Sequence, residues 1–387
     1  MTHVEFPTDL YTDAAIRDPH PLYRAIRDLA PAVWLPAHDV FALGRYDDVL
    51  AALRNDKVLI SGRGVALNAA VNEVPSRTTL ISDGELHRQR RSVLMKPMMP
   101  NALRGVRTRI EVLADALVAD LAARGSFDGI ADFARHLPVA VVSHLVGLPE
   151  AGRERMLEWA SATFNVLGPA NARATEALPV LGEMVRYASE VKSDGLAPDG
   201  WAAGVFAAAR EGRLDPEDAR GLLIDYIGPS LDTTILATGW LLLSFGKHPE
   251  QYDRVRANPE LIPAAVREVL RFESPVRSFS RVAARAYECG KVSIPAGARV
   301  VVLYGSANRD ERHFAEPDRF DVTRDARDHL AFGTGAHRCA GAHLAQLELE
   351  VLLRTLVERV RRIEVGEPEP LMSNALRGLR SFPASFH

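Results

Sequence analysis

A single cysteine, Cys339, lies in a glycine-rich segment, FGTGAHRCAG, at residues 332–341. An apolar pattern with helical periodicity starts directly after this segment, so we expect Cys339 near the first turn of a helix. Backbone N–H groups at the start of a helix favour negative charge and therefore a thiolate. The glycines permit backbone geometry that a side chain would forbid, and they let a flat, bulky group lie against the main chain. These features indicate a thiolate that is presented to a metal ion.

Two other interpretations of Cys339 are open at this point. It could be an ordinary buried cysteine, because free cysteine is among the most buried residue types. It could also join His337 and His343 in a zinc site. The other cysteine, Cys289, lies far upstream, and the chain has no CxxC motif. Structural zinc sites usually take four ligands rich in cysteine, so zinc is the weaker alternative.

The spacing FxxGxHxCxG resembles the haem-binding loop of the cytochrome P450 superfamily. The resemblance implies haem b as the cofactor, with Cys339 as the axial thiolate ligand and with Phe332 and Gly333 in the loop that contacts the haem. It also implies a mainly α-helical fold, the cytochrome P450 fold, with a triangular helical body and a small β-rich region. We expect residues 1–387 to form one such domain, because no repeat or flexible linker divides the sequence.

An ExxR pair, Glu268 and Arg271, falls within a helical pattern over residues 263–272. Residues three apart share one face of a helix, and on a surface such an ion pair contributes only about 0.2–0.5 kcal/mol. The family resemblance implies more, because Arg319 in the segment PDRF matches the arginine that completes a cluster with ExxR. We therefore predict that Glu268, Arg271 and Arg319 form a buried structural network that supports the cysteine loop.

Four residues occupy positions at which the family binds the haem propionates: His87, Arg91, Arg281 and His337. His87 and Arg91 have i, i+4 spacing on a helical pattern, so both side chains can reach one edge of the haem. Arg281 lies in a strand-like stretch at residues 278–283, and His337 precedes the cysteine by two residues. Each alone would more often be a surface charge. Together they suit propionates, which an apolar pocket holds only when such donors meet them.

A helical pattern over residues 216–247 is apolar on nearly every face and about 45 Å long, which predicts a buried helix on the distal side of the haem. Asp225 and Asp232 interrupt the pattern, and the uncharged run after Asp232 is too short to span a membrane. An acid followed by threonine, Asp232-Thr233, resembles the oxygen-activating pair of the superfamily. The resemblance implies that these two residues deliver protons during catalysis.

The residues before this pair depart from the family pattern, since Pro229 and Ser230 replace small residues that open a groove for dioxygen. Proline lacks an N–H, and its ring clashes with the carbonyl four residues back, at Asp225. We expect a kink in a continuous helix, a freed carbonyl that binds water, and a space over the iron that Ser230 narrows. Alternatively, Pro229 marks a break in the helix after Gly228.

Mostly apolar residues occupy the family positions of the substrate pocket, which predicts a small hydrophobic substrate. Arg63 or Arg77 could bind a carboxylate, although loop arginines are more often exposed. The runs RGV at 63–65 and LDTT at 231–234 weakly resemble members that act on substituted aromatic acids, and a terpenoid or a fatty acid remains open. The predicted lining residues are Leu67, Arg77, Leu80, Phe164, Leu167, Ile227, Ser230, Leu231, Val276, Phe279 and Leu376.

The resemblance implies a monooxygenase that inserts one oxygen atom from O2 into a C–H bond, by hydroxylation or by oxidative O-dealkylation. Electrons would come from NAD(P)H through a reductase and a separate ferredoxin, because the chain leaves no room for a flavin or iron–sulfur domain. Two alternatives are a peroxygenase that uses hydrogen peroxide, which the acid–threonine pair disfavours, and a non-catalytic haem-binding or small-molecule-binding protein. A basic face on the cysteine side would bind an acidic ferredoxin. Its predicted residues are Arg88, Arg90, Lys96, Arg104, Arg107, Arg109 and Arg338.

Composition and charge indicate which binding partners and which cellular compartment to expect. The chain has 387 residues and a net charge of -3, which gives no strong bias toward nucleic acid or a membrane surface. The N-terminal residues hold acids and prolines instead of a signal peptide or anchor, and two cysteines fit a reducing cytoplasm, so we expect a cytoplasmic protein similar to soluble bacterial family members. Strand-like runs at 33–43 and 293–304, the second with a tight turn at 295–298, predict the small β region.

Overall fold

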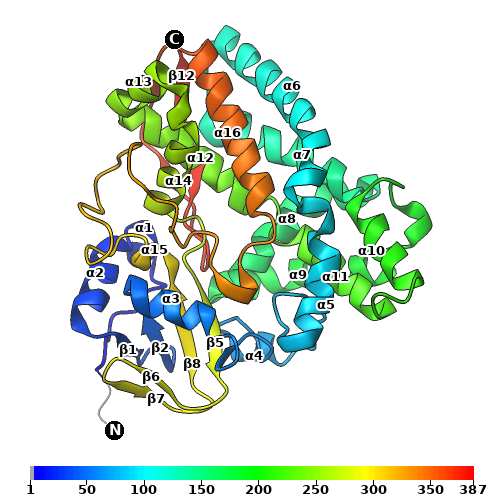
Figure 1. Cartoon of the computed structure of the whole chain (residues 1–387), viewed down its shortest axis with the longest axis vertical. Helices are drawn as coiled ribbons and strands as arrows, with labels where there is room; N and C mark the ends of the chain where they lie inside the picture. The colour runs from blue at the N-terminus through cyan, green and yellow to red at the C-terminus, as the bar shows by residue number, and fades with distance from the viewer. Residues whose placement is uncertain (1–3) are drawn as a thin grey trace.

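Helices form most of residues 4–387, the part of the chain that the computed structural model describes (Figure 1). Several of the longer helices begin with proline in the first turn, where its missing N–H costs nothing. The α-helices are α1 (Asp13–Arg17), α2 (His20–Leu29), α3 (Tyr46–Arg54), α4 (Ala69–Asn72), α5 (Gly84–Met95), α6 (Pro100–Arg124), α7 (His136–Val146), α8 (Glu150–Val166), α9 (Ala172–Glu190), α10 (Trp201–Arg210), α11 (Pro216–Ile227), α12 (Asp232–Lys247), α13 (Pro249–Ala257), α14 (Ile262–Glu273), α15 (Tyr304–Ala307) and α16 (Ala342–Arg359).

The strands are short, and most of them lie in one corner of the molecule beside the N-terminal helices (Figure 1). They are β1 (Ala32–Leu35), β2 (Val40–Leu43), β3 (Leu59–Ile60), β4 (Ser126–Asp128), β5 (Ser278–Ala283), β6 (Tyr287–Cys289), β7 (Val292–Ile294), β8 (Arg299–Leu303), β9 (Ile363–Val365), β10 (Glu369–Pro370), β11 (Leu379–Ser381) and β12 (Pro383–Phe386). The largest sheet has the order β1-β2-β8-β5-β3, with β2 and β8 parallel and its other pairs antiparallel. A second sheet joins β12 to β4 and β9.

The predicted strand-like runs fall in this β region. The run at 33–43 folds as the β1–β2 hairpin. The predicted turn at 295–298 is present, because Gly297 has a φ of +85° and the Ala298 N–H donates to the Pro295 carbonyl at 3.2 Å. The strands on either side of this turn do not pair with each other, since β7 pairs with β6 and β8 pairs with β2 and β5. The expected mainly helical fold with a small β-rich part is therefore confirmed.

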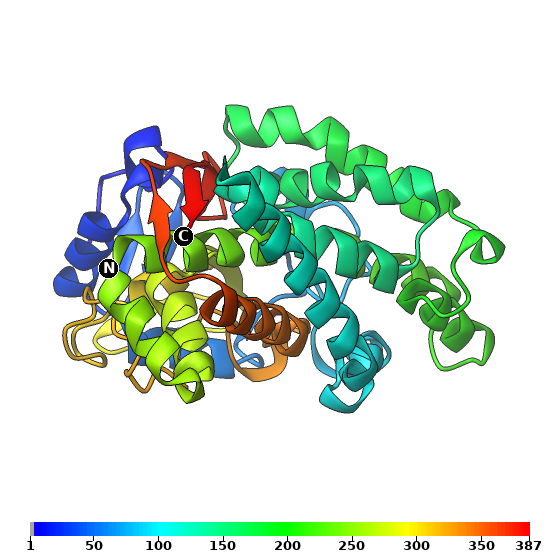
Figure 2. The same ribbon diagram turned by 90° about the horizontal axis from the view of Figure 1, so that it is seen from above.

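The helix α12 crosses the interior of the helical body and is buried from Thr234 to Phe245 (Figures 1 and 2). It packs against α8, α14 and α16. A Cβ atom on Gly239 would lie 2.4 Å from Ile130 Cδ1, so the glycine allows this close approach. Within residues 4–387, no helix combines the length and the apolarity that a membrane crossing requires.

The prediction of one kinked helix over residues 216–247 is wrong, because α11 and α12 are separate helices with a non-helical stretch at 228–231. The alternative, a helix break at the proline, is the observed arrangement. The last bond of α11 runs from the Gly228 N–H to the Ile224 carbonyl at 2.9 Å. Pro229 has no N–H to continue the helix, and the Leu231 carbonyl accepts the first N–H groups of α12.

Candidate active site

The cysteine segment forms a tight loop ahead of α16, as the sequence pattern predicts. The Cys339 N–H donates to the Phe332 carbonyl at 2.8 Å. Gly333 and Gly335 have φ angles of +61° and +71°, in the left-handed region that glycine tolerates. A Cβ atom on Gly335 would also lie 2.5 Å from the Leu53 carbonyl oxygen. The glycines therefore serve both the backbone turn and the packing of the loop against α3.

The Cys339 side chain faces an internal cavity, to which its surface is exposed although protein surrounds it. Burial raises the pKa of the thiol, whereas the N–H groups of Gly341 and Ala342 and the charges of Arg91 and Arg338 lower it. The same groups would stabilise a thiolate bound to a metal ion. In the described part of the chain, no three His, Cys, Asp or Glu side chains are grouped so that they could bind a metal ion. This argues against the zinc interpretation.

The cavity has a volume of about 630 Å³ and lies between the cysteine loop and the α11–α12 junction. Small-molecule and cofactor sites typically have volumes of about 300–1,000 Å³. All the residues predicted to contact the haem line this one cavity, although they come from widely separated segments of the chain: His87, Arg91, Arg281, Phe332, Gly333, His337 and Cys339.

Of the four residues predicted to bind propionates, His87 presents a donor without a partner in the described part of the chain, whereas Arg91 and Arg281 each donate to a backbone carbonyl, those of Arg338 and Ser280. His87 is buried, and its Nε2 has no hydrogen-bond partner among residues 4–387. The rings of His87 and His337 lie 4.2 Å apart between centroids. Burial and the charge of Arg281 lower the pKa of His337 to about 3. Arg91 also lines this part of the site. A group with two carboxylates would supply both the acceptors and the counter-charge, so these residues fit the haem.

The ExxR pair is fully buried in α14. Arg271 donates from Nε and Nη2 to the two carboxylate oxygens of Glu268 at 2.7 and 2.8 Å. Its Nη1 donates to the carbonyls of Asn308 and Pro317 at 2.8 and 2.9 Å. Removing one partner of such a buried pair typically costs about 3–5 kcal/mol, because the other charge is left unpaired. The pair therefore has a structural function and lies outside the cavity lining.

The prediction that Arg319 completes this network is wrong for its side chain. The Arg319 side chain is 53% exposed and pairs with Glu316 at 3.2 Å, and only its backbone carbonyl approaches Arg271. The inward position is taken by Arg324, whose Nε donates to Glu268 Oε1 at 3.3 Å. Arg319 lies within the PDRF segment and Arg324 four residues after it, and the backbone path decides which of them turns inward.

Asn308 connects the buried ion pair to the cysteine loop and was not predicted from the sequence. Its Nδ2 donates to Ser274 Oγ at 2.8 Å, and its Oδ1 accepts from the Leu330 N–H at 2.6 Å. The Leu330 carbonyl in turn accepts from the Gly333 N–H at 2.9 Å. A continuous series of hydrogen bonds thus runs from α14 to the loop that carries Cys339, and no motif spacing indicates it.

The two residues of the predicted oxygen-activating pair occupy different environments. Thr233 lines the cavity, and its hydroxyl donates to the Pro229 carbonyl at 3.0 Å. Asp232 is buried outside the cavity lining, beside Ser161 and the charge of Arg135. Burial raises the pKa of Asp232 to about 7, and these two neighbours oppose the shift. The acid therefore titrates near neutral pH, next to a hydroxyl that reaches the cavity.

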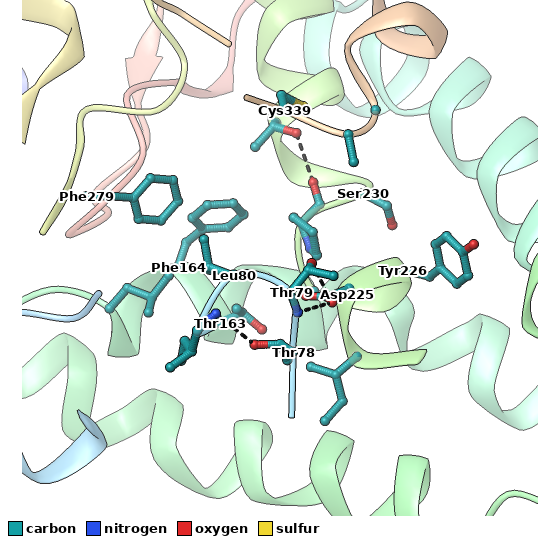
Figure 3. A pocket seen from close by; sticks show the side chains of 18 of the residues that line it. Thr78, Thr79, Leu80, Thr163, Phe164, Asp225, Tyr226, Ser230, Phe279 and Cys339 are labelled. Carbon is teal, nitrogen blue, oxygen red and sulfur yellow. Dashed lines mark hydrogen bonds between the residues drawn. The ribbon is translucent and has the colours of Figure 1, made fainter. Parts of the chain in front are cut away.

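Most residues predicted for the substrate pocket line the same cavity. Figure 3 shows the side chains of Leu80, Phe164, Ser230 and Phe279 around it, together with Cys339. The predicted residues that line the cavity are Arg77, Leu80, Phe164, Leu167, Ser230, Val276 and Phe279.

Four residues predicted for the pocket lie elsewhere, and those predictions are wrong. Ile227 and Leu231 flank the helix break and point into the main core, where they are 0% and 1% exposed. Leu376 packs behind Phe164 in a smaller apolar cluster. Leu67 packs toward the cluster around the β1–β2 hairpin. The helix break changes which faces of α11 and α12 meet the cavity. The predictions for Ile227 and Leu231 assumed one continuous helix, so they assigned these two side chains to the wrong face.

Arg77 and Arg90 both bind Asp218. Arg77 Nη1 lies 3.0 Å and Arg90 Nη2 lies 2.7 Å from the same oxygen, Oδ1. The Arg77 guanidinium is therefore engaged, although it lines the cavity, and Arg63 is exposed outside the lining. Arg90 is only 4% exposed, so the prediction that it belongs to a basic docking face is wrong. The other predicted residues of that face are exposed: Arg88, Lys96, Arg104, Arg107, Arg109 and Arg338.

The chain resembles proteins of one family along almost its whole length. A family model described as Cytochrome P450 matches residues 199–379. The protein named Cytochrome p450 CYP199A2 from Rhodopseudomonas palustris is 36% identical, over 95% of this chain and 90% of that protein. Cytochrome P450 107B1 from Saccharopolyspora erythraea is 32% identical over 99% of both chains. The beta-dihydromenaquinone-9 omega-hydroxylase of Mycobacterium tuberculosis is 32% identical, over 96% of this chain and 76% of that protein.

Solved structures show the same fold. The structure of P450BioI in complex with an acyl carrier protein ligated to hexadec-9Z-enoic acid has a TM-score of 0.87 and 25% identity, and covers 96% of this chain and 98% of that one. Mycobacterium marinum cytochrome P450 CYP268A2 in complex with pseudoionone has a TM-score of 0.86 and 28% identity, over 98% of this chain and 99% of that one.

Proposed function

Because the chain belongs to the cytochrome P450 family and is a haem b monooxygenase, we propose that Cys339 is its axial iron ligand and that its substrate is a small hydrophobic molecule. The reaction is hydroxylation or oxidative O-dealkylation, with electrons from NAD(P)H through a reductase and a ferredoxin, and residues 1–387 act as one domain. The observation that carries this proposal is the convergence, in one cavity, of the cysteine, the donors for the propionates, and a mostly apolar wall.

On the cysteine side, the residues of the chain stabilise a thiolate and bind two propionates. The N–H groups of Gly341 and Ala342 favour the thiolate of Cys339, while His87 and His337 offer their ring nitrogens to the propionates together with Arg91 and Arg281. When bound there, the haem supplies the activation of dioxygen for insertion into a C–H bond.

On the distal side, two residues of the chain deliver protons. The Thr233 hydroxyl in the cavity wall can pass a proton to a group inside the cavity. Asp232, whose pKa is raised to about 7 by burial, can take up and release a proton at neutral pH. Asp232 also interacts with Ser161 and with the charge of Arg135, which is exposed. Asp232 and Thr233 are thus the proposed proton-delivery pair.

The apolar wall positions the substrate and excludes bulk water. Phe164 comes from α8 and Phe279 from β5, and both line the cavity that the cysteine loop borders (Figure 3). Val276, just before β5, lines the same cavity. Such side chains hold a hydrophobic molecule without competing hydrogen bonds. The exposed cations around Lys96 and Arg104 are the proposed docking face for an acidic ferredoxin, since complementary charge raises encounter rates.

Two measurements test the proposal. The reduced protein under carbon monoxide is expected to show the haem–thiolate absorption band that is characteristic of the family. Turnover of compounds that shift the spin state of the haem is then measured with ferredoxin, reductase and NAD(P)H under isotopically labelled dioxygen, and the product is expected to contain one labelled oxygen atom. Product that forms only with hydrogen peroxide, or that carries no label, would contradict the proposed reaction.

A further inference from the structure

The cavity contains an acid that the proposed oxygen chemistry does not use. Asp225 lies in the last turn of α11 and lines the cavity (Figure 3). Its Oδ2 accepts two hydrogen bonds from Thr79, one from the backbone N–H at 2.6 Å and one from the hydroxyl at 2.7 Å. The Leu80 N–H also acts on this carboxylate. A carboxylate can accept about four hydrogen bonds, so these three donors hold it in place and leave capacity for one more.

Asp225 forms no salt bridge within residues 4–387, although the charges of Arg90 and Arg91 act on it. Arg90 is itself bound to Asp218 at 2.7 Å, and Arg77 is bound to the same acid. Arg91 donates to the Arg338 carbonyl. A carboxylate that is surrounded by protein and lacks a counter-charge is costly to keep ionised. Burial accordingly raises the pKa of Asp225 to about 6, and the Thr79 donors limit the rise. At pH 7 to 8 the group is still mostly a carboxylate.

The neighbours of Asp225 that Figure 3 labels are uncharged, whereas the charged residues of the cavity lining include Arg77, Arg91, Glu217 and Arg220. Leu80 and Phe164 are apolar, and the polar neighbours Thr78, Thr163 and Ser230 are neutral (Figure 3). A molecule in this part of the cavity would therefore meet an apolar enclosure with one fixed anion. A substrate carboxylate placed beside Asp225 would be repelled.

We propose that Asp225 selects apolar substrates that carry a protonated amine, which pairs with the Asp225 carboxylate while the apolar body packs between Phe164 and Phe279. The proposal rests on the proposed function, because it assigns the substrate class of the same cavity. Asp225 is a specificity-determining residue in this arrangement, and it takes no part in oxygen activation. The protonated amine supplies the positive charge that pairs with the carboxylate and donates the further hydrogen bond that its oxygens can accept. This pairing holds the amine at Asp225, away from the cysteine loop.

The test compares ligands that share one apolar body and differ in charge: N,N-dimethyldecylamine, 1-decanol and decanoate, and the matching amine, alcohol and acid of a biphenylmethyl series. Dissociation constants are measured from the spin-state shift of the ferric haem at pH 7.5, for the wild type and for Asp225→Asn. In the wild type the amine is expected to bind at least about tenfold more tightly than the acid. In Asp225→Asn the amine should bind about tenfold more weakly than in the wild type, and the acid should bind more tightly. The affinity for the alcohol should change by no more than about twofold.

Ser230→Ala is the matched control, because it changes a neutral residue in the same wall and should shift all members of a series by a similar factor. An amine affinity that is equal in the wild type and in Asp225→Asn, or that is no higher than that of the acid in both series, would overturn the proposal. An alcohol that loses as much affinity as the amine would also overturn it, in favour of a neutral hydrogen-bond donor. Absence of the reduced carbon monoxide band in the wild type would instead mean that the haem–thiolate assignment has failed, so the two failures are distinct.

Discussion

The two sides of the cavity are held in different ways. On the cysteine side, backbone hydrogen bonds and left-handed glycines shape the loop, and a buried ion pair supports it through Asn308. On the distal side, the main chain is interrupted at 228–231, and the Thr233 hydroxyl bonds to a backbone carbonyl in place of a helical N–H. The side that holds the cofactor is thus closely hydrogen-bonded, whereas the side that meets the substrate has an interrupted backbone and an acid, Asp225, that forms no salt bridge within residues 4–387.

The sharpest test of the cysteine side is Cys339→Ser. We expect complete loss of the thiolate band of the reduced carbon monoxide complex and of monooxygenase activity, because no other side chain that lines the cavity can supply a thiolate. Spectra of the reduced carbon monoxide complex and product analysis measure both. Cys289→Ala is the control, since Cys289 is buried in the β region, and it should keep the band. Loss of the band in the control and its retention in Cys339→Ser would reverse the assignment.

The supporting network predicts a large difference between two arginines that the sequence places in the same cluster. Arg271→Ala leaves Glu268 buried and unpaired, so we expect the free energy of unfolding to fall by about 3–5 kcal/mol. Arg319→Ala removes a half-exposed side chain and should cost no more than about 0.5 kcal/mol. Urea unfolding of the haem-loaded variants measures both values. Equal losses would show that the Arg319 side chain belongs to the network after all.

On the distal side, Thr233→Ala should leave haem binding intact and impair proton delivery. We expect the ratio of product formed to NAD(P)H consumed to fall about tenfold or more, because the hydroxyl that faces the cavity is lost while the thiolate side is unchanged. The reduced carbon monoxide band serves as the internal control for folding and haem loading. Normal coupling in this variant would contradict the proton-delivery role of Thr233.

These two sides also differ in how far the sequence predicts them. Cys339, its glycines and the ExxR pair follow from contiguous motifs, in which a few neighbouring residues determine the local geometry. Arg281 is correctly placed because the strand at 278–283 is evident from its composition. The spacing within each motif is enough to predict these positions, since each motif lies within one element or one loop.

The failed predictions depend on contacts between distant segments or on the break between α11 and α12. Arg90 turns inward because Asp218, on α11, meets it there. Ile227 and Leu231 face the core because the helix breaks at Pro229. The sequence did contain a signal for Asp225, since it is an acid within a nearly all-apolar helical pattern, but its partner Thr79 lies in another part of the chain.

Asp225, in the distal wall, predicts that the affinity for an amine depends on pH. The pKa of Asp225 is raised to about 6, so the group is a carboxylate above this pH and becomes neutral as the pH falls through it. The dissociation constant of N,N-dimethyldecylamine should therefore rise about tenfold between pH 7.5 and pH 5. Spin-shift titrations at these two pH values measure it. Asp225→Asn should bind the amine with nearly equal affinity at both, and a step of the same size in that variant would assign the titration to another group.

The smallest expected effect concerns the outer surface of the cysteine side, where exposed cations are proposed to receive the ferredoxin. Lys96→Glu and Arg104→Glu should each slow reduction of the haem by ferredoxin about two- to fivefold at low salt, because charge complementarity acts mainly on the association rate. The difference from the wild type should shrink as the ionic strength approaches about 0.5 M, since exposed charges are then screened. Stopped-flow reduction under carbon monoxide measures these rates. Arg254→Glu reverses an exposed charge on α13 and should leave the rate unchanged. An equal slowing in that control would mean that net charge alone, and no defined face, attracts the ferredoxin.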